Sequence, residues 1–338
     1  MSATAPATIA QMNEASKWYG DVIGLNQVSV LIQPGITGLL GPNGAGKSTF
    51  LKLLTGQLAP NRGMVRVLGR DPWADRGVYR EMGYCPDSEQ LYEEMTGLAF
   101  VRLIGRLAGY SARDAALRAD VQLERVGMAQ HAGRIIHGYS KGMRQRIRLA
   151  AALIHEPKLV VLDEPLNGLD PLGRIEMLKI FKDLAASGCS VVVSSHVLHE
   201  IENLTRHMIM LHRGRVLAEG EISEVRSLIE SQPLTLRVES PQARAVGAAV
   251  VGLDSVTSIE FASGFASAAI LNGRTAASAQ SKSDFSAPPS AVIIRTRTPD
   301  AVLETLQHEA AENRLEIGGI EALDDNLDAV FRYLVEEE

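Results

Sequence analysis

The stretch Gly41-Pro42-Asn43-Gly44-Ala45-Gly46-Lys47-Ser48-Thr49 decides the fold of this chain. It fits the pattern G-x-x-x-x-G-K-[ST] throughout, and it lies between an apolar run and a segment with helical patterning. Glycines let backbone N–H groups gather around phosphate oxygens, and the helix that follows directs its positive dipole end at them. In this pattern Lys47 reaches the β- and γ-phosphates, and the Ser48 hydroxyl ligates Mg²⁺. The stretch therefore predicts a nucleotide-binding α/β fold. An ordinary Gly-rich turn is the alternative interpretation.

Short apolar runs bounded by turns surround this loop and predict a buried parallel sheet. Gly38–Leu40, Leu159–Leu162 and Val191–Val193 are such runs, and polar residues follow each of them. Open α/β sheets bind their ligands at the carboxyl ends of the strands. We expect one α/β domain over residues 1–222, with a helical subdomain at about 88–157 that includes an amphipathic helix at 143–154.

Two acidic residues, Asp163 and Glu164, follow the run Leu159–Leu162 directly. Asp163 at a strand end can hold Mg²⁺ through its water shell. Glu164 can orient and deprotonate an attacking water, and a general base of this kind contributes on the order of 10²–10⁴ in rate. The alternative is a solvated Asp-Glu turn before Pro165.

Composition narrows the class of protein further. The chain has 338 residues, and its net charge of −6 argues against a nucleic-acid partner. Its two cysteines, Cys85 and Cys189, suit a reducing compartment. No apolar run reaches the ~18 residues that span a bilayer, and the first ten residues do not resemble a secretory signal. We therefore expect a cytoplasmic protein.

A further motif, Tyr139-Ser140-Lys141-Gly142-Met143, precedes the acidic pair. Ser140 is a good helix N-cap, and Gly142 leaves backbone amides exposed to an anion. A simple capped helix is the alternative. With the phosphate loop and the acidic pair, this motif resembles the signature of the ABC ATPase family, and the resemblance covers roughly residues 10–220. The family's usual form is Leu-Ser-Gly-Gly-Gln, and the variant here is similar to that of ABC exporter ATPases whose permease is a separate polypeptide.

The resemblance implies roles for four more residues. Tyr19 resembles the aromatic residue that stacks on adenine, His196 resembles the switch histidine at the γ-phosphate, and Asp170 lies in the loop that crosses the dimer interface. A structural aromatic, a structural histidine and an ordinary Gly turn are the alternatives. Asp87 departs from the family, which usually has Gln after Gly-Tyr-x-Pro. A carboxylate there can still ligate Mg²⁺ or its water.

The implied mechanism is a head-to-tail dimer of this chain, or of this chain with a closely related ATPase subunit, around two ATP molecules and Mg²⁺. Each ATP would lie between one phosphate loop and the partner's Ser140 and Gly142. A separate transmembrane permease would dock near Leu91, Tyr92, Met95 and Phe100 and hold the protein on the inner face of the membrane, unless these residues fill the subdomain's own core. The alternatives are a non-transport ABC ATPase and a nucleotide-gated regulatory module.

The last part of the chain, residues 223–338, predicts a small α+β domain. Two β-α-β halves, at 234–261 and 291–320, flank an Ala- and Ser-rich insertion at about 262–290, and a helix is expected at 325–336. This order matches a ferredoxin-like, split βαβ unit, for which we expect a regulatory or dimer-stabilising role. A loosely packed extension is the alternative.

Overall fold

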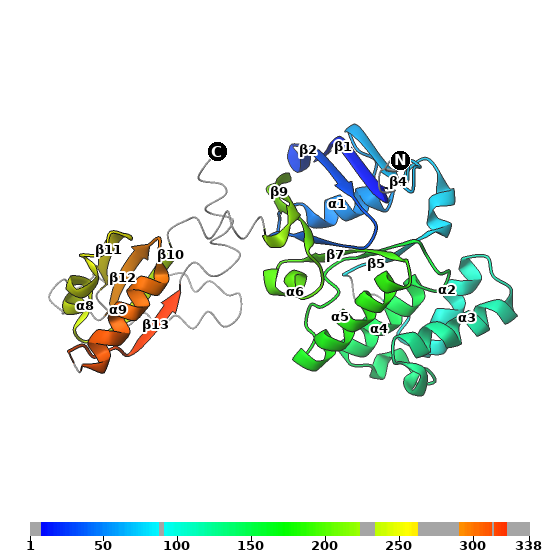
Figure 1. The fold of residues 1–338 in the computed structure, drawn as a ribbon. Coiled ribbons are helices and arrows are strands. Elements are labelled where there is room, and N and C mark those ends of the chain that lie inside the picture. Colours follow the sequence, from blue (N-terminus) through cyan, green and yellow to red (C-terminus); the bar gives the residue numbers. More distant parts are fainter. Residues whose placement is uncertain (1–7, 88–90, 224–233, 263–290, 313, 323–338) are drawn as a thin grey trace, which may run out of the picture. The chain divides into compact units, whose positions relative to one another are not determined.

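The chain divides into two compact units, Met1–Val225 and Arg226–Glu338 (Figure 1). The computed structural model describes residues 8–87, 91–223, 234–262, 291–312 and 314–322. None of the helices in this described part of the chain combines the length and apolar character needed to span a membrane.

A six-stranded sheet forms the centre of the first unit, in the order β5-β6-β7-β3-β8-β9. The strands from β5 to β8 are parallel, and β9 pairs antiparallel with β8. Continuous apolar runs build the centre of the sheet, since every residue of β6 and β7 is buried. This confirms the predicted parallel α/β fold. The strands are β3 (Ile36–Leu40), β5 (Met82–Cys85), β6 (Leu159–Leu162), β7 (Ser190–Ser195), β8 (His207–His212) and β9 (Arg215–Glu221).

A second, antiparallel sheet in the order β2-β1-β4 was not anticipated from the sequence. Its strands are β1 (Ala10–Tyr19), β2 (Val22–Ile32) and β4 (Arg62–Val67). Helix α1 (Lys47–Leu54) lies beside it in Figure 1. Phe50 and Leu51 of α1 are fully buried in one core with Val28 and Val65 of the small sheet. This packing fixes the helix that begins at the phosphate loop.

The predicted helical subdomain is present between β5 and β6, and hydroxyl caps start its three main helices. Thr96, Ser111 and Ser140 each accept a hydrogen bond from the backbone N–H three residues further on. The helices of the first unit after α1 are η1 (Arg76–Arg80), α2 (Gly97–Leu107), α3 (Ala112–Arg125), η2 (Ala129–His131), η3 (Ile136–Gly138), α4 (Lys141–Ala152), α5 (Pro171–Ala186) and α6 (Leu198–Glu202).

The second unit has the predicted ferredoxin-like order. Its sheet runs β11-β12-β10-β13, and each neighbouring pair is antiparallel, as in a split βαβ unit. Buried residues of the two helices form one core with alternate strand residues such as Val238 and Ile294. The elements are β10 (Leu234–Glu239), α8 (Ala243–Val250), β11 (Val256–Ala262), β12 (Ala291–Thr296), α9 (Pro299–Ala311) and β13 (Gly319–Ala322).

The last strand of this unit begins later than predicted, at Gly319 rather than Leu315. Leu315 is only 8% exposed and packs into the core below the sheet, which explains its apolar character without a strand. Most of the expected insertion at 262–290 and the expected helix at 325–336 lie outside the described residues.

Candidate functional site

The phosphate loop requires glycine at defined positions. Gly46 is the N-cap of α1 and has a left-handed backbone, with φ of 104°. A Cβ there would lie 2.6 Å from the carbonyl oxygen of Gly24. A Cβ at Gly41 would lie 2.6 Å from the carbonyl oxygen of Leu211. Since real Cβ atoms do not approach backbone this closely, only glycine leaves the cradle in which backbone amides can surround phosphate oxygens.

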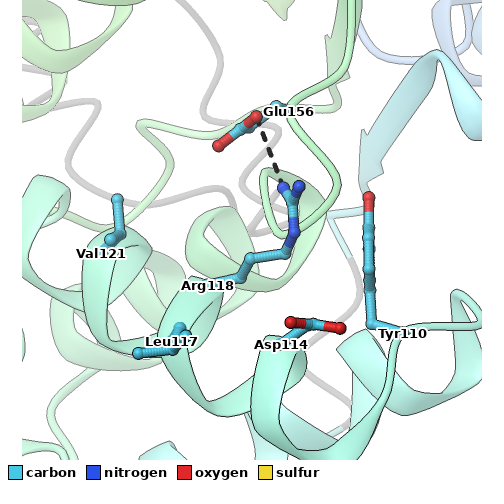
Figure 2. Close-up of a pocket in the computed structure, with 6 residues that line it drawn as sticks. All are labelled: Tyr110, Asp114, Leu117, Arg118, Val121 and Glu156. Carbon is cyan, nitrogen blue, oxygen red and sulfur yellow. Dashed lines mark ion pairs between the residues drawn. The ribbon is translucent and has the colours of Figure 1, made fainter.

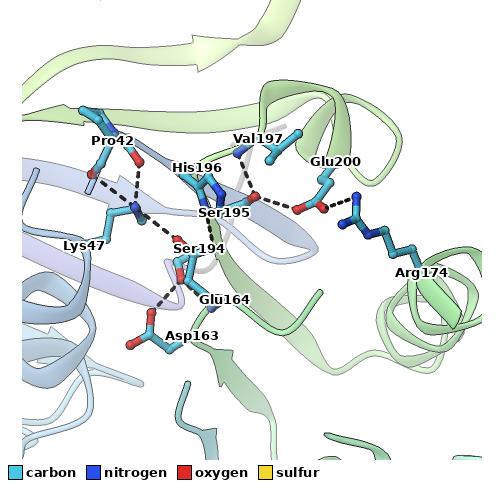
Figure 3. A network of polar contacts seen from close by, with 11 residues as sticks. Pro42, Lys47, Asp163, Glu164, Arg174, Ser194, Ser195, His196, Val197 and Glu200 are labelled. Carbon is cyan, nitrogen blue, oxygen red and sulfur yellow. Dashed lines mark hydrogen bonds and ion pairs between the residues drawn. The ribbon is translucent and has the colours of Figure 1, made fainter. Parts of the chain in front are cut away.

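Lys47 lies at the centre of a polar network at the ends of β3, β6 and β7 (Figure 3). Its side chain is 6% exposed, and its Nζ donates to the carbonyl oxygens of Gly41 at 2.6 Å and Pro42 at 3.2 Å. The same Nζ lies 3.1 Å from Oε1 of Glu164. The neighbouring ends of the parallel strands therefore bring the ammonium of Lys47 into direct contact with the carboxylate of Glu164.

Ser194 holds the acidic pair in place, a role that the sequence interpretation missed. Its fully buried hydroxyl donates to Oδ1 of Asp163 at 2.7 Å and accepts from the backbone N–H of Glu164 at 2.8 Å. Glu164 has a positive φ of 47°, which is strained for a residue with a side chain. Its Oε2 lies 3.0 Å from Nδ1 of His196. The carboxylate of Glu164 therefore lies between Lys47 and His196.

Three predicted Mg²⁺ ligands gather beside this network. Burial raises the pKa of Asp163, hydrogen bonds from Ser194 and Ser48 oppose that shift, and the charges of Glu164 and Asp87 add to it. Ser48 and Asp87 therefore lie close enough to act on Asp163. The described residues contain no group of three or more His, Cys, Asp or Glu side chains that could hold a metal alone. This donor set fits Mg²⁺, which binds through one or two carboxylates, water and substrate phosphates.

Tyr19 ends β1 with an exposed ring, 45% accessible, near the start of α1. Its hydroxyl lies 3.4 Å from Oγ1 of Thr49, the last residue of the phosphate loop motif. A Cβ at Gly24 would lie 2.8 Å from Cε2 of Tyr19, so the bare backbone of Gly24 supports the ring. An exposed aromatic face beside the loop fits a base that stacks on it.

Ser140, Gly142 and Asp170 stand apart from this network. Ser140 caps α4 by accepting from the N–H of Met143 at 3.3 Å, and Asp170 caps α5 by accepting from the N–H of Gly173 at 3.2 Å. Within the described residues, no hydrogen bond or ion pair joins any of the three to residues 41–49. The N-terminus of α4, where a helix can bind an anion, therefore lies outside the described contacts of the phosphate loop.

The helical subdomain carries surface cavities that differ in their lining. One, of about 370 Å³, lies between it and β5 and is lined by Tyr84, Leu91, Phe100 and Leu107 among others. Phe100 is 8% exposed and belongs to the core, whereas Tyr92, whose ring centroid lies 6.2 Å from that of Phe100, is 61% exposed. The predicted docking residues therefore divide into core and surface.

Another cavity, of about 360 Å³, lies along α3 (Figure 2). Arg118 lies over the ring of Tyr110 at 4.3 Å and pairs with Glu156 at 3.4 Å. This cavity has no glycine cradle for phosphate, so it does not compete with the P-loop as the nucleotide site.

The fold and the site together define a P-loop nucleotide-binding protein with a helical insertion. The sequence model of the ABC transporter family matches residues 25–167. The chain is 40% identical over 201 residues to the uncharacterized ABC transporter ATP-binding protein YxlF of Bacillus subtilis (strain 168), covering 60% of this chain and 66% of that protein. It is 37% identical over 222 residues to the daunorubicin resistance ATP-binding protein DrrA3 of Streptomyces coeruleorubidus, covering 65% and 70%.

A solved structure of an ATP-binding subunit of an ABC transporter has a similar fold, with a TM-score of 0.59 and 30% identity. The similarity covers 66% of this chain and 93% of that one. The chain belongs to the family of ABC transporter ATP-binding proteins, whose members bind and hydrolyse ATP.

Proposed function

We propose that this protein is the ATP-hydrolysing motor subunit of an ABC transporter that drives a separate permease, and that the transporter is an exporter. The observation that carries the proposal is the position of Glu164 between Lys47 and His196, beside Asp163. This arrangement supplies an ammonium for the γ-phosphate, a carboxylate for the attacking water and an acidic ligand for Mg²⁺. Phosphoryl transfer needs little else than such positioning and charge stabilisation.

The residues of this site divide the chemistry among them. Lys47 binds the β- and γ-phosphates, and the glycine cradle surrounds them with backbone N–H groups. Glu164 accepts a proton from the attacking water, and His196, in contact with Glu164, orients that carboxylate and the γ-phosphate. Ser48, Asp163 and Asp87 would hold Mg²⁺, which neutralises phosphate charge when bound.

A head-to-tail dimer is the second part of the proposal. Ser140 caps α4, and within the described residues no hydrogen bond or ion pair joins it to the phosphate loop of its own chain. Pairing the loop of one subunit with Ser140 and Gly142 of the other surrounds the phosphates. Asp170 would lie near the same interface.

The permease is the third part. The 370 Å³ cavity beside β5 is lined by residues on both sides of the loop residue Asp87, among them Pro86 and Leu91, at the junction of the sheet and the helical subdomain. An apolar helix of a permease that docks there would respond to movement of the subdomain. Such a partner would place the protein at the inner face of the membrane. A relative of Cupriavidus metallidurans that is 35% identical over 227 residues is named Nod factor export ATP-binding protein I, which supports the export direction.

A steady-state ATPase assay on the purified chain tests the central claim. We expect Mg²⁺-dependent turnover that is lost in Lys47→Ala. A nucleotide-gated regulatory module would instead bind ATP without turnover, and this result would contradict the proposed motor function.

A further inference from the structure

A buried arginine joins the helix that begins at Ser140 to the loop that follows β5. Arg148 lies on α4 and is 7% exposed. Its Nη1 donates to the carbonyl oxygens of Pro86 at 3.1 Å and Asp87 at 3.2 Å, which lie 62 and 61 residues earlier in the chain. Its Nη2 donates to Oε1 of Gln145, one turn earlier on α4.

Gln145 makes a second connection between the same two segments. Its side chain is 5% exposed, and its Nε2 donates to Sγ of Cys85 at 3.6 Å. Cys85 ends β5, and burial raises the pKa of its thiol to about 12, so the thiol stays neutral. Together the two side chains hold three consecutive positions, Cys85, Pro86 and Asp87, to one face of α4.

The type of residue at position 148 is informative. A guanidinium is costly to bury unless its donors are used, and an apolar side chain would pack α4 against β5 without that cost. Arginine instead offers a planar fork of donors that can reach two carbonyl oxygens and an amide at once. The contacts of Arg148 are therefore directional and specify where the loop lies relative to the helix.

The two segments that Arg148 joins end at different parts of the ATP site. Asp87 lies close enough to Asp163 for its charge to contribute to the raised pKa of that carboxyl. The other end is the N-terminus of α4, where Ser140 and Gly142 precede Arg148 by about two turns of helix. The glutamine that the family usually carries at the loop is replaced here by Asp87, while the backbone of this position is held by Arg148.

We propose that Arg148 is a positioning residue that couples the loop at Asp87 to the N-terminus of α4. Binding of Mg²⁺ and ATP to one subunit thereby sets the placement of its Ser140 and Gly142 for the partner's nucleotide. The role of Ser140 and Gly142 toward a second ATP rests on the proposed function. The mechanical connection between loop and helix rests on the contacts of Arg148 alone.

Hydrogen–deuterium exchange on the full-length chain tests the connection directly. Peptides covering residues 41–49, 82–87 and 139–146 are compared with and without Mg²⁺ and ATP, in a Glu164→Gln background that limits turnover. We expect protection of all three in the parent. In Arg148→Leu we expect unchanged protection at 41–49, and loss of most of the protection at 139–146. Equal protection at 139–146 in both proteins would overturn the proposal.

Two further variants separate coupling from simple stability. Arg146→Leu is the matched control, because Arg146 lies on the same helix but donates to the carbonyl oxygen of Val126 and pairs with Glu176 instead of the loop. It should retain the ATP-dependent protection at 139–146. Arg148→Lys keeps the charge but loses the fork, so it should give partial protection. If Arg148→Leu does not fold, Arg148→Lys is compared with the parent instead. Full ATP-dependent protection of residues 139–146 in Arg148→Lys would then contradict the proposal.

Steady-state kinetics give an independent readout. Misplacement of groups that surround a reacting phosphate costs up to about 10²-fold in rate, whereas the P-loop contacts that bind ATP are untouched. Arg148→Leu should therefore lower kcat by roughly tenfold or more and change KM little. If kcat/KM fell by the same factor because KM rose while kcat stayed unchanged, Arg148 would have a role in ATP binding instead.

The outcomes distinguish this inference from the proposed function. Absence of ATP-dependent protection at 41–49 in the parent would overturn both, since no nucleotide would bind. Protection at 41–49 without any change at 139–146 in the parent would overturn the coupling alone. In that case the nucleotide site would stand, and α4 would respond to something other than the loop.

Discussion

The Nζ of Lys47 lies 3.1 Å from Oε1 of Glu164, in a site where both side chains are largely buried. An ammonium and a carboxylate in such a place attract each other strongly, because the surroundings screen charge less than water does. A nucleotide phosphate that binds Lys47 has to compete with this carboxylate. Glu164 therefore affects the affinity for ATP as well as the rate of its hydrolysis.

Replacing Glu164 with glutamine tests both effects. Glu164→Gln removes the base, so turnover should fall by roughly 10²-fold or more. It also removes the competing negative charge at Lys47, so ATP affinity should stay equal or rise. Steady-state hydrolysis and equilibrium binding of ATP measure the two effects. The variant should also accumulate as an ATP-bound dimer in size-exclusion chromatography. Hydrolysis near the parent rate would contradict the assignment of Glu164 as base.

Mixed dimers test whether the ATP site is shared between subunits. A Lys47→Ala subunit combined with a Gly142→Asp subunit gives one site with two damaged faces and one site with two intact faces. Purified mixed dimers should therefore hydrolyse more ATP than either mutant homodimer. ATP hydrolysis no faster than in the homodimers would count against a shared site, unless each site can hydrolyse ATP only when the other site does.

Gly24→Ala tests whether Gly24 holds the ring of Tyr19 in position to stack on adenine. The added methyl would lie 2.8 Å from Cε2 of Tyr19 and 3.1 Å from Cγ2 of Thr49, so the ring has to move. Base stacking contributes about 1–3 kcal/mol, which predicts a loss of ATP affinity of roughly fivefold or more. Binding of inorganic triphosphate should be unchanged. Tyr19→Phe is the control, since it keeps the ring and should bind ATP nearly as well as the parent.

Tyr92→Asp tests the proposed permease surface. Tyr92 is 61% exposed, so a charge there should leave folding and basal ATPase activity intact while it weakens association with membranes that contain the permease. Leu117→Asp is the matched control, because Leu117 is 58% exposed but lies on α3 in the cavity of Figure 2. Co-sedimentation with membranes of the source cells measures the difference. Loss of folding in Tyr92→Asp would assign the residue to the subdomain core.

Truncation tests the independence of the second unit. Each unit has its own hydrophobic core, so a chain that ends at residue 225 should fold and bind ATP. We expect weaker dimerisation or altered regulation, measured by analytical ultracentrifugation and ATPase assays.

Ala262 pairs with Ala291 across β11 and β12, so the chain leaves and re-enters the sheet at adjacent positions. Deleting residues 265–287 should therefore preserve the fold, and unfolding of the second unit would contradict this.

The parts of the site that follow each other in sequence could be predicted. The phosphate loop, the strand Leu159–Leu162 and the acidic pair after it all show their roles in short continuous patterns. The order of the ferredoxin-like elements was predictable for the same reason, because each strand and helix has a clear apolar period.

The antiparallel sheet and the positioning residues could not be predicted in this way. The pairing of β1 with β2 shifts register at three places, so neither strand keeps a simple alternation of apolar and polar residues. Ser194 and Arg148 contact partners 31 and 61 residues away, respectively. Serine after a strand and arginine in a helix are ordinary in sequence, and only the fold gives them partners.

The left-handed backbone of Glu164 has a consequence for how this protein would respond to selection for heat resistance. Glycine adopts a positive φ without the steric cost that a side chain incurs, so Glu164→Gly relieves strain of order 1 kcal/mol or more. It also leaves the buried ammonium of Lys47 without the carboxylate that lies 3.1 Å away, and loss of one partner of a buried ion pair costs about 3–5 kcal/mol. A search for thermostable variants that ignores activity would therefore gain nothing by removing Glu164. At this position the ion pair outweighs the backbone strain, so robustness and catalysis favour the same residue.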